Sequence, residues 1–177
     1  DMTQKELRDK LGYVPQKGVL FSGTIDSNIR YGKPEITDAQ VKEAAEVAQA
    51  TEFIDTKPEK YESPVSQGGT NVSGGQKQRL SIARAIAKEP EIFIFDDSFS
   101  ALDFKTDSQL RKALKEYTKD ATTVIVAQRI STILGADQII VLDDGHMAGI
   151  GTHKELMANC EVYQQIARSQ LSEEELA

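Results

Sequence analysis

The stretch from Asn71 to Asp103 reads NVSGGQKQRLSIARAIAKEPEIFIFDDSFSALD, and the rest of the chain can be interpreted around it. Near its start, Ser73-Gly74-Gly75-Gln76 is predicted to open a helix. Glycines at that point leave the N–H groups of the positive helix end bare, so an anion can approach them. A short glycine-rich helix start is a weak signal when taken alone.

The residues after this tetrapeptide predict a helix and then a strand. An apolar stripe of the helix consists of Leu80, Ile82, Ala83, Ile86 and Ala87. Its polar residues are Lys77, Gln78, Arg79 and Arg84. Pro90 ends it, and the apolar run 92–95 predicts a short buried parallel strand. Asp96 and Asp97 follow at its carboxyl end, where ligands bind in open α/β sheets. One such carboxylate is often enough for Mg²⁺ beside phosphate groups, because this cation keeps several waters.

Together with Ser100-Ala101-Leu102-Asp103, this order of motifs resembles the signature motif, Walker B motif and D-loop of the ATP-binding cassette (ABC) family. The alternative for the whole set is an ordinary βαβ unit. Upstream, residues 14–16 and 20–29 look like the Q-loop region of ABC exporters. The resemblance implies that Gln16 touches Mg²⁺ and the attacking water beside the membrane domain; otherwise it is a surface glutamine after a proline. Residues 63–69 stand where exporters have their X-loop, with a plain surface loop as the alternative.

Composition places the chain among globular proteins with one domain. Its 177 residues are 39% hydrophobic and 28% charged, and no apolar run approaches the ~20 residues of a membrane helix. The net charge of −7 argues against nucleic acid as a partner. The single cysteine, Cys160, leaves no internal disulfide and fits a reducing cytoplasm. The chain shows no signal peptide and begins with Asp1, so we expect a piece of a longer protein.

Alternating strands and helices predict an α/β fold with a mainly parallel sheet. Predicted helices cover residues 3–11, 41–48 (with Thr37 and Gln40 as a capping box), 51–55 and 108–117. A short helix is predicted to start at 130–134, and a C-terminal helical segment runs over 152–171. Predicted strands cover 12–15, a buried 122–126, and 138–142, which a hairpin turn at Asp143-Asp144-Gly145 joins to 146–151. Residues 57–71 are expected to form a loop and 172–175 a solvated tail. His146 and His153 are interpreted as structural or surface residues.

A phosphate loop of the form G-x-x-x-x-G-K-[S/T] is missing from the chain. The resemblance places that loop upstream of the Q-loop, so we expect an incomplete P-loop NTPase (ABC ATPase) fold. Residues 1–177 would be the C-terminal two thirds of one ATP-binding domain, with a helical signature subdomain at about 34–89 and the RecA-like core part and C-terminal helices from 1–33 and 90–177. We expect this chain alone to bind ATP weakly or not at all, and its open sheet to favour swapping or self-association.

Two positions depart from the family pattern. Asp97 stands where a Glu usually polarises the attacking water, and a reach shorter by ~1 Å can lower a rate ~10²-fold. Gln128 replaces a His, and its amide can hydrogen-bond but does not titrate. Either change alone is compatible with neutral drift. Both together predict a site that binds ATP and turns it over poorly.

The resemblance also implies partners and a division of roles. Two cassettes pack head to tail, so Ser73, Gly74 and Gly75 would serve the partner's ATP, and Gln76 and Asp103 are also expected to bind nucleotide. Asp96 and Gln16 would hold Mg²⁺, and Asp97, Gln128 and Gln16 would act on this chain's own ATP. We therefore predict the degenerate half of a heterodimeric exporter, attached to membrane-spanning domains at the cytoplasmic face of the cell membrane. The alternatives are a non-transport ABC ATPase acting as a clamp and a purely structural α/β module; the transported substrate is not readable from these residues.

Overall fold

The computed structural model describes residues 2–172 and divides into two compact units, with the boundary between Val126 and Ala127. The first unit contains α1 (Gln4–Lys10), β1 (Leu11–Val14), β2 (Gly23–Thr24), α2 (Ile25–Ile29), η1 (Arg30–Gly32), α3 (Asp38–Val47), α4 (Thr51–Asp55), η2 (Lys60–Glu62), β3 (Pro64–Val65), η3 (Gln67–Gly69), α5 (Gly74–Ala87), β4 (Ile92–Asp96), α6 (Phe104–Tyr117) and β5 (Thr122–Val126). The second contains α7 (Ile130–Ile133), β6 (Ile139–Asp143), β7 (His146–Gly151), α8 (His153–Asn159) and α9 (Glu161–Gln170). Of the predicted tail, residues 173–175 lie outside the described part.

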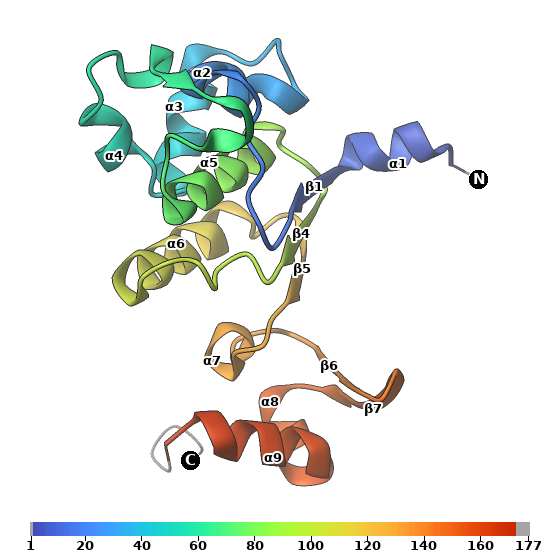
Figure 1. Cartoon of the computed structure of the whole chain (residues 1–177). Helices are drawn as coiled ribbons and strands as arrows, with labels where there is room; N and C mark the ends of the chain where they lie inside the picture. The colour runs from blue at the N-terminus through green and yellow to red at the C-terminus, as the bar shows by residue number, and fades with distance from the viewer. Residues whose placement is uncertain (1, 173–177) are drawn as a thin grey trace. The chain divides into compact units, whose positions relative to one another are not determined.

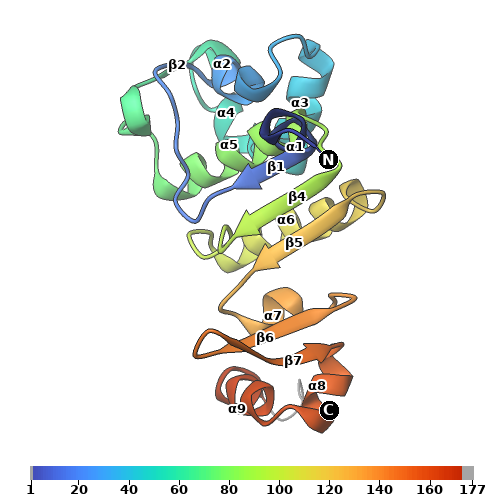
Figure 2. The ribbon, with the colours of Figure 1, turned by 90° about the vertical axis from the view of Figure 1, so that its right-hand side faces the viewer.

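A parallel sheet in the order β1-β4-β5 organises the first unit (Figure 2). The predicted strand 92–95 is its central member, and α5 and α6 lie on one side of it (Figure 1). Side chains alternate along each strand, so Val14, Phe93 and Phe95 point into the core on the helix side and are at most 2% exposed. The apolar stripe predicted for α5 is buried in the same core. The α/β fold with a parallel sheet is therefore confirmed.

The opposite face of this sheet is open. Tyr13, Val124 and Val126 are about half exposed, and Ile94 between them is half-buried. The prediction that 122–126 is a buried strand is therefore wrong: β5 is an edge strand in the described part, and helices cover only one of its faces. The expectation of an open apolar sheet surface holds for the described residues.

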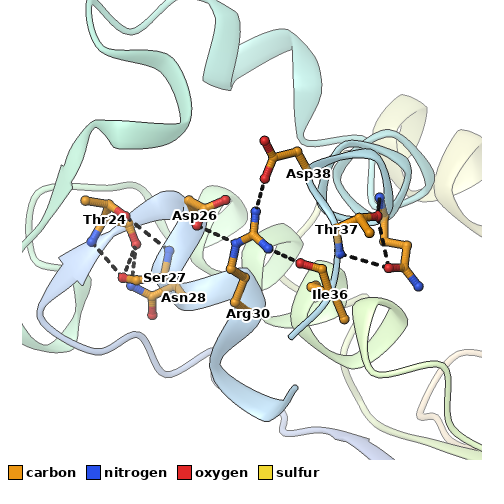
Figure 3. Close-up of polar contacts among 9 residues, drawn as sticks. Thr24, Asp26, Ser27, Asn28, Arg30, Ile36, Thr37 and Asp38 are labelled. Atoms are coloured by element: carbon orange, nitrogen blue, oxygen red, sulfur yellow. Dashed lines mark hydrogen bonds and ion pairs between the residues drawn. The ribbon is translucent and has the colours of Figure 1, made fainter. Parts of the chain in front are cut away.

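Polar caps set most helix starts. The predicted capping box of Thr37 and Gln40 is present at α3, and Thr3, Thr24, Ser73 and Thr152 cap their helices in the same way. Figure 3 shows how Arg30 joins α2 to α3: its Nε lies 2.7 Å from Asp26 Oδ2, and its guanidinium also contacts Asp38 and the Ile36 carbonyl. The pKa of Arg30 is raised, and the hydrogen bond to Asp26 is the largest cause.

Several element boundaries differ from the predictions. Helix α6 begins at Phe104 rather than at residue 108, because the Asp103 side chain accepts a hydrogen bond from the Thr106 N–H at 3.0 Å and caps the helix there. The C-terminal helical segment predicted over 152–171 consists of two helices, because Cys160 has an extended backbone between α8 and α9. Residues 57–71 are not all loop: they include η2, η3 and β3, which pairs with β2. Strands of two residues carry no periodicity that a sequence could show.

The second unit is a hairpin packed on two helices. Strands β6 and β7 are antiparallel, and Asp144 and Gly145 both have positive φ, 45° and 77°, as a tight hairpin turn requires. One hairpin face packs on α8 and α9 through a cluster that includes Val141 and Tyr163. His153 Nδ1 lies 2.8 Å from the Tyr163 hydroxyl, which agrees with a structural role for this histidine. Among the described residues no helix is both long enough and apolar enough to cross a membrane.

Candidate functional site

Two carboxylates stand at the carboxyl end of the central strand. Asp96 is the last residue of β4 and pairs with Val126 across the ladder. Asp97 follows with a left-handed backbone, φ 44°, and its N–H donates to the Val126 carbonyl oxygen at 2.8 Å. Aspartate is one of the few residues besides glycine that adopt this conformation readily. The chain therefore turns sharply here, and the neighbouring Asp96 and Asp97 side chains meet different partners.

These partners come from β1 and the loop after it. Gln16 Nε2 donates to Asp97 Oδ2 at 3.1 Å, and the Tyr13 hydroxyl donates to Asp96 Oδ2 at 3.0 Å. A third bond, from Ser98 Oγ to the Val14 carbonyl oxygen at 2.8 Å, is buried. The ends of the two strands are thus joined at three points. The structure brings Gln16, Asp96 and Asp97, which were predicted separately from two motifs, to one edge of the sheet.

The donor set at this edge suits Mg²⁺. It consists of carboxylate and amide oxygens, which are the ligands that Mg²⁺ prefers. Residues 2–172 contain no group of three or more His, Cys, Asp or Glu side chains that could hold a metal ion by themselves. A cation at Asp96 would therefore need further oxygen ligands from water or from a substrate such as a phosphate. This is the way Mg²⁺ is commonly held in nucleotide sites, so the residues present fit the ion.

The tip of α5, where the sequence predicts an approach for anions, is exposed at Ser73 and Gly74. Ser73 caps the helix: its Oγ accepts from the Gln76 N–H at 3.2 Å, and Gln76 Oε1 accepts from the Ser73 N–H at 3.1 Å. The Ser73 hydroxyl hydrogen remains available to donate. A Cβ placed at Gly74 would meet nothing within 4 Å, whereas one at Gly75 would lie 3.6 Å from the Ala101 carbonyl oxygen. The tip therefore faces open space on one side and contacts the turn after β4 on the other.

Asp103 lies in that same turn, one residue before α6. Its carboxylate accepts a hydrogen bond from the Thr106 N–H, and this bond lowers the pKa of the carboxyl group. Its exposed side chain is already engaged as a helix cap. A ligand that contacts the Asp103 carboxylate would therefore meet a group that is also bound to the Thr106 N–H.

Gln128 belongs to the second unit and is described there alone. Its side chain is exposed, and its backbone carbonyl accepts from Gln170 Nε2 at 2.8 Å. The neighbouring Ile130 N–H donates to Gln170 Oε1 at 2.9 Å. Gln170 thus holds the segment that carries Gln128 against α9.

Gln78, predicted on the polar side of its helix, is buried and has a role that the sequence did not indicate. It lies on α5, is 1% exposed, and binds the loop at one position before Gln16 and one position after it. Its Nε2 donates to the Pro15 carbonyl oxygen at 3.0 Å, and its Oε1 accepts from the Gly18 N–H at 2.9 Å. Gly18 packs so closely on α5 that a Cβ there would lie 2.9 Å from Lys77 backbone atoms. No local signal points to this contact, since about sixty residues separate its partners.

Arg84 has a similar hidden role. It donates to the Val19 carbonyl oxygen at 2.9 Å and to the Asn28 carbonyl and side-chain oxygens at 2.8 Å each. Its guanidinium also lies over the stacked rings of Phe21 and Tyr31, and burial lowers its pKa. The loop after β1 is therefore fastened to α5 at two places, by Gln78 near its start and by Arg84 farther on.

Comparisons with known proteins identify the family. A family model described as "ABC transporter" matches residues 1–100, more than half of the chain, and the chain therefore belongs to the ABC transporter family. The resemblance predicted from Asn71–Asp103 is confirmed.

Individual relatives are similar over nearly the whole chain. An uncharacterized ABC transporter ATP-binding protein of Mycobacterium tuberculosis is 46% identical over 94% of this chain and 29% of its own length. A putative multidrug export ATP-binding/permease protein of Staphylococcus aureus is 45% identical over 94% of this chain and 29% of its own length. A bacterial Atm1-family ABC exporter solved with ATP bound superposes with a TM-score of 0.92 at 40% identity, covering 97% of this chain and 30% of that one. The chain thus spans about 30% of the relatives it matches, and its fold is that of an ABC exporter ATPase.

Proposed function

We propose that this chain is the ATP-binding part of an ABC exporter, which couples ATP binding and hydrolysis to transport across a membrane. The observation that carries the proposal is the contact between Gln16 and Asp97 beside Asp96 at the end of the central strand. Similarity to proteins described as multidrug export ATP-binding/permease proteins supports the same direction of transport. It also supports membrane-spanning domains as partners and a location at the cytoplasmic face of the membrane.

Each residue of the strand edge has a separate role in this proposal. Asp96 holds Mg²⁺, which when bound neutralises charge on the phosphate oxygens of ATP. Gln16 and Asp97 orient the attacking water, and their mutual hydrogen bond of 3.1 Å limits where either side chain can reach. Because Asp97 is already shortened relative to a Glu, this arrangement favours binding over fast hydrolysis. Gln128, which does not titrate, would add to the same deficit.

The signature tip serves a second cassette. Ser73 retains a hydroxyl hydrogen, and the N–H groups of the first helical turn, including those of Gly74 and Gly75, have no partner inside the helix. Gln76 holds Ser73 in place through the capping box, and Asp103 lies in the adjacent turn. This chain would then contribute an intact signature to the partner's ATP and a weak catalytic set to its own. That asymmetry is expected of the degenerate half of a heterodimer.

Mutations in the full-length transporter pair test the two roles separately. Changing Asp97 to Glu together with Gln128 to His should raise ATP turnover at this chain's own site. The substitution Ser73→Ala should strongly reduce turnover at the partner's site, because the γ-phosphate loses a donor. ATPase rates are measured with the partner's own catalytic carboxylate intact and removed, which separates the two sites. Unchanged total ATPase in Ser73→Ala would show that the signature assignment is wrong.

The isolated chain gives an independent check. It lacks the phosphate loop that cradles the β- and γ-phosphates, so calorimetry should give a millimolar affinity for Mg·ATP or none. A micromolar affinity would contradict the proposed division of the nucleotide site.

A further inference from the structure

Tyr13 makes a contact that the proposed roles above do not use. It lies on the open face of the sheet and is 55% exposed, yet its hydroxyl donates to Asp96 Oδ2 at 3.0 Å. The ladder pairs Tyr13 with Ile94, so Asp96 is the diagonal neighbour two residues farther along β4. The long Tyr13 side chain spans this diagonal between the two parallel strands.

We infer that Tyr13 is a positioning residue for the cation ligand Asp96: its hydroxyl holds one carboxylate oxygen and thereby turns the other toward the metal. This inference rests on the proposed function, since it takes Asp96 as the ligand. Carboxylates that ligate metals are commonly oriented by outer hydrogen-bond partners, and loss of such a partner typically weakens metal binding 10- to 100-fold. A carboxylate with no such donor turns freely about its last bond and pays more conformational entropy on binding.

The strand pairing around Tyr13 fixes the position of its hydroxyl group relative to Asp96. Parallel ladder pairing runs from Leu11–Ile92 to Val14–Phe95, and the buried bond from Ser98 Oγ to the Val14 carbonyl closes it just beyond Asp96. Slippage of β1 along β4 would break that bond and bury the wrong face of the strand. The distance between the phenol and the carboxylate is therefore set by the sheet and not by a flexible loop. Gln16, by contrast, lies past the strand end and approaches the other carboxylate.

The substitution Tyr13→Phe removes only the hydroxyl and leaves the ring. The matched control is Tyr31→Phe, which removes a hydroxyl from a tyrosine that is 58% exposed and stacks on Phe21, and Asp96→Asn removes the ligand charge. Because Tyr13 is exposed, its variant opens no cavity, and circular dichroism with a thermal melt verifies folding.

Two NMR measurements on the isolated chain test the inference without any enzymatic activity. In the first, Mn²⁺ is titrated as a paramagnetic probe, and the broadening of amide signals from residues 95–98 reports binding at Asp96. Tyr13→Phe should need about tenfold more Mn²⁺ than wild type for equal broadening, Tyr31→Phe should match wild type, and Asp96→Asn should abolish the effect. In the second, the carboxyl ¹³C shift of Asp96 without metal should move in Tyr13→Phe and stay constant in Tyr31→Phe.

The outcomes separate this inference from the proposed function. If Asp96→Asn abolishes broadening while Tyr13→Phe titrates like wild type, Asp96 is a ligand that Tyr13 does not position, and only the present inference is overturned. If Asp96→Asn leaves the broadening unchanged, Asp96 is not the cation ligand, and the proposed function and this inference are both overturned.

Discussion

Gln78 should contribute substantially to stability, because its side chain binds two backbone groups of the loop that carries Gln16. The informative substitution is Gln78→Met, which keeps nearly the same volume and removes both hydrogen bonds to the Pro15 carbonyl and the Gly18 N–H. Each backbone group left without a partner costs about 1–3 kcal/mol when buried. Since Pro15 and Gly18 are half-buried and water can partly replace Gln78, we expect a loss of about 2–3 kcal/mol.

Urea denaturation followed by circular dichroism measures this loss, and an unchanged slope with denaturant shows that the unfolded state is comparable. The control is Gln109→Met on the exposed face of α6, expected within about 0.5 kcal/mol of wild type. Hydrogen exchange should also accelerate at the Gly18 amide. A loss below about 0.5 kcal/mol in Gln78→Met, with exchange at Gly18 as slow as in wild type, would refute the assigned role.

Three further predictions follow from contacts in the same unit. Arg84→Lys replaces the planar guanidinium, which binds oxygens of both Val19 and Asn28, with a single ammonium group. The free energy of unfolding measured with urea should fall by about 2 kcal/mol, and an unchanged value would contradict this role. Asp97 has a left-handed backbone, φ 44°, which Glu adopts less readily than Asp or Asn. Asp97→Glu should therefore lower the free energy of unfolding by about 1 kcal/mol, whereas Asp97→Asn should leave it nearly unchanged. Equal losses in both variants would instead implicate the hydrogen bond between Asp97 and Gln16. The pKa of Glu89 is lowered, mainly by the hydrogen bond from Lys33 and then by the one from Gln40. The ionised Glu89 therefore stabilises the folded state above its ordinary pKa of 4.5, and this stabilisation is lost as pH falls through the pKa of the folded state. Glu89→Gln should therefore flatten the fall of the melting temperature between about pH 5 and pH 3, and an equally steep fall would argue against it.

Much of the architecture could be predicted because its signals are local. Ser73 with Gln76 and Thr37 with Gln40 start their helices through bonds to residues three positions away, and the structure contains both boxes. The alternation of apolar and polar residues, the proline after α5 and the Asp144–Gly145 turn likewise act over a few residues. Their physical basis lies in the backbone of the segment itself, so they can be read without knowing what surrounds it.

Other features depend on which segments meet. Tyr13 and Asp96 are 83 residues apart, and no pattern in either strand shows that they share a face and a hydrogen bond. Gln78 looks like an ordinary polar helix residue until the loop that it binds is folded against it. The strand 122–126 has the composition of a buried strand, yet its burial depends on how many neighbours the sheet has and which faces helices cover. Exposure and long-range hydrogen bonds are properties of the assembled layers, and for that reason only the tertiary structure decides them.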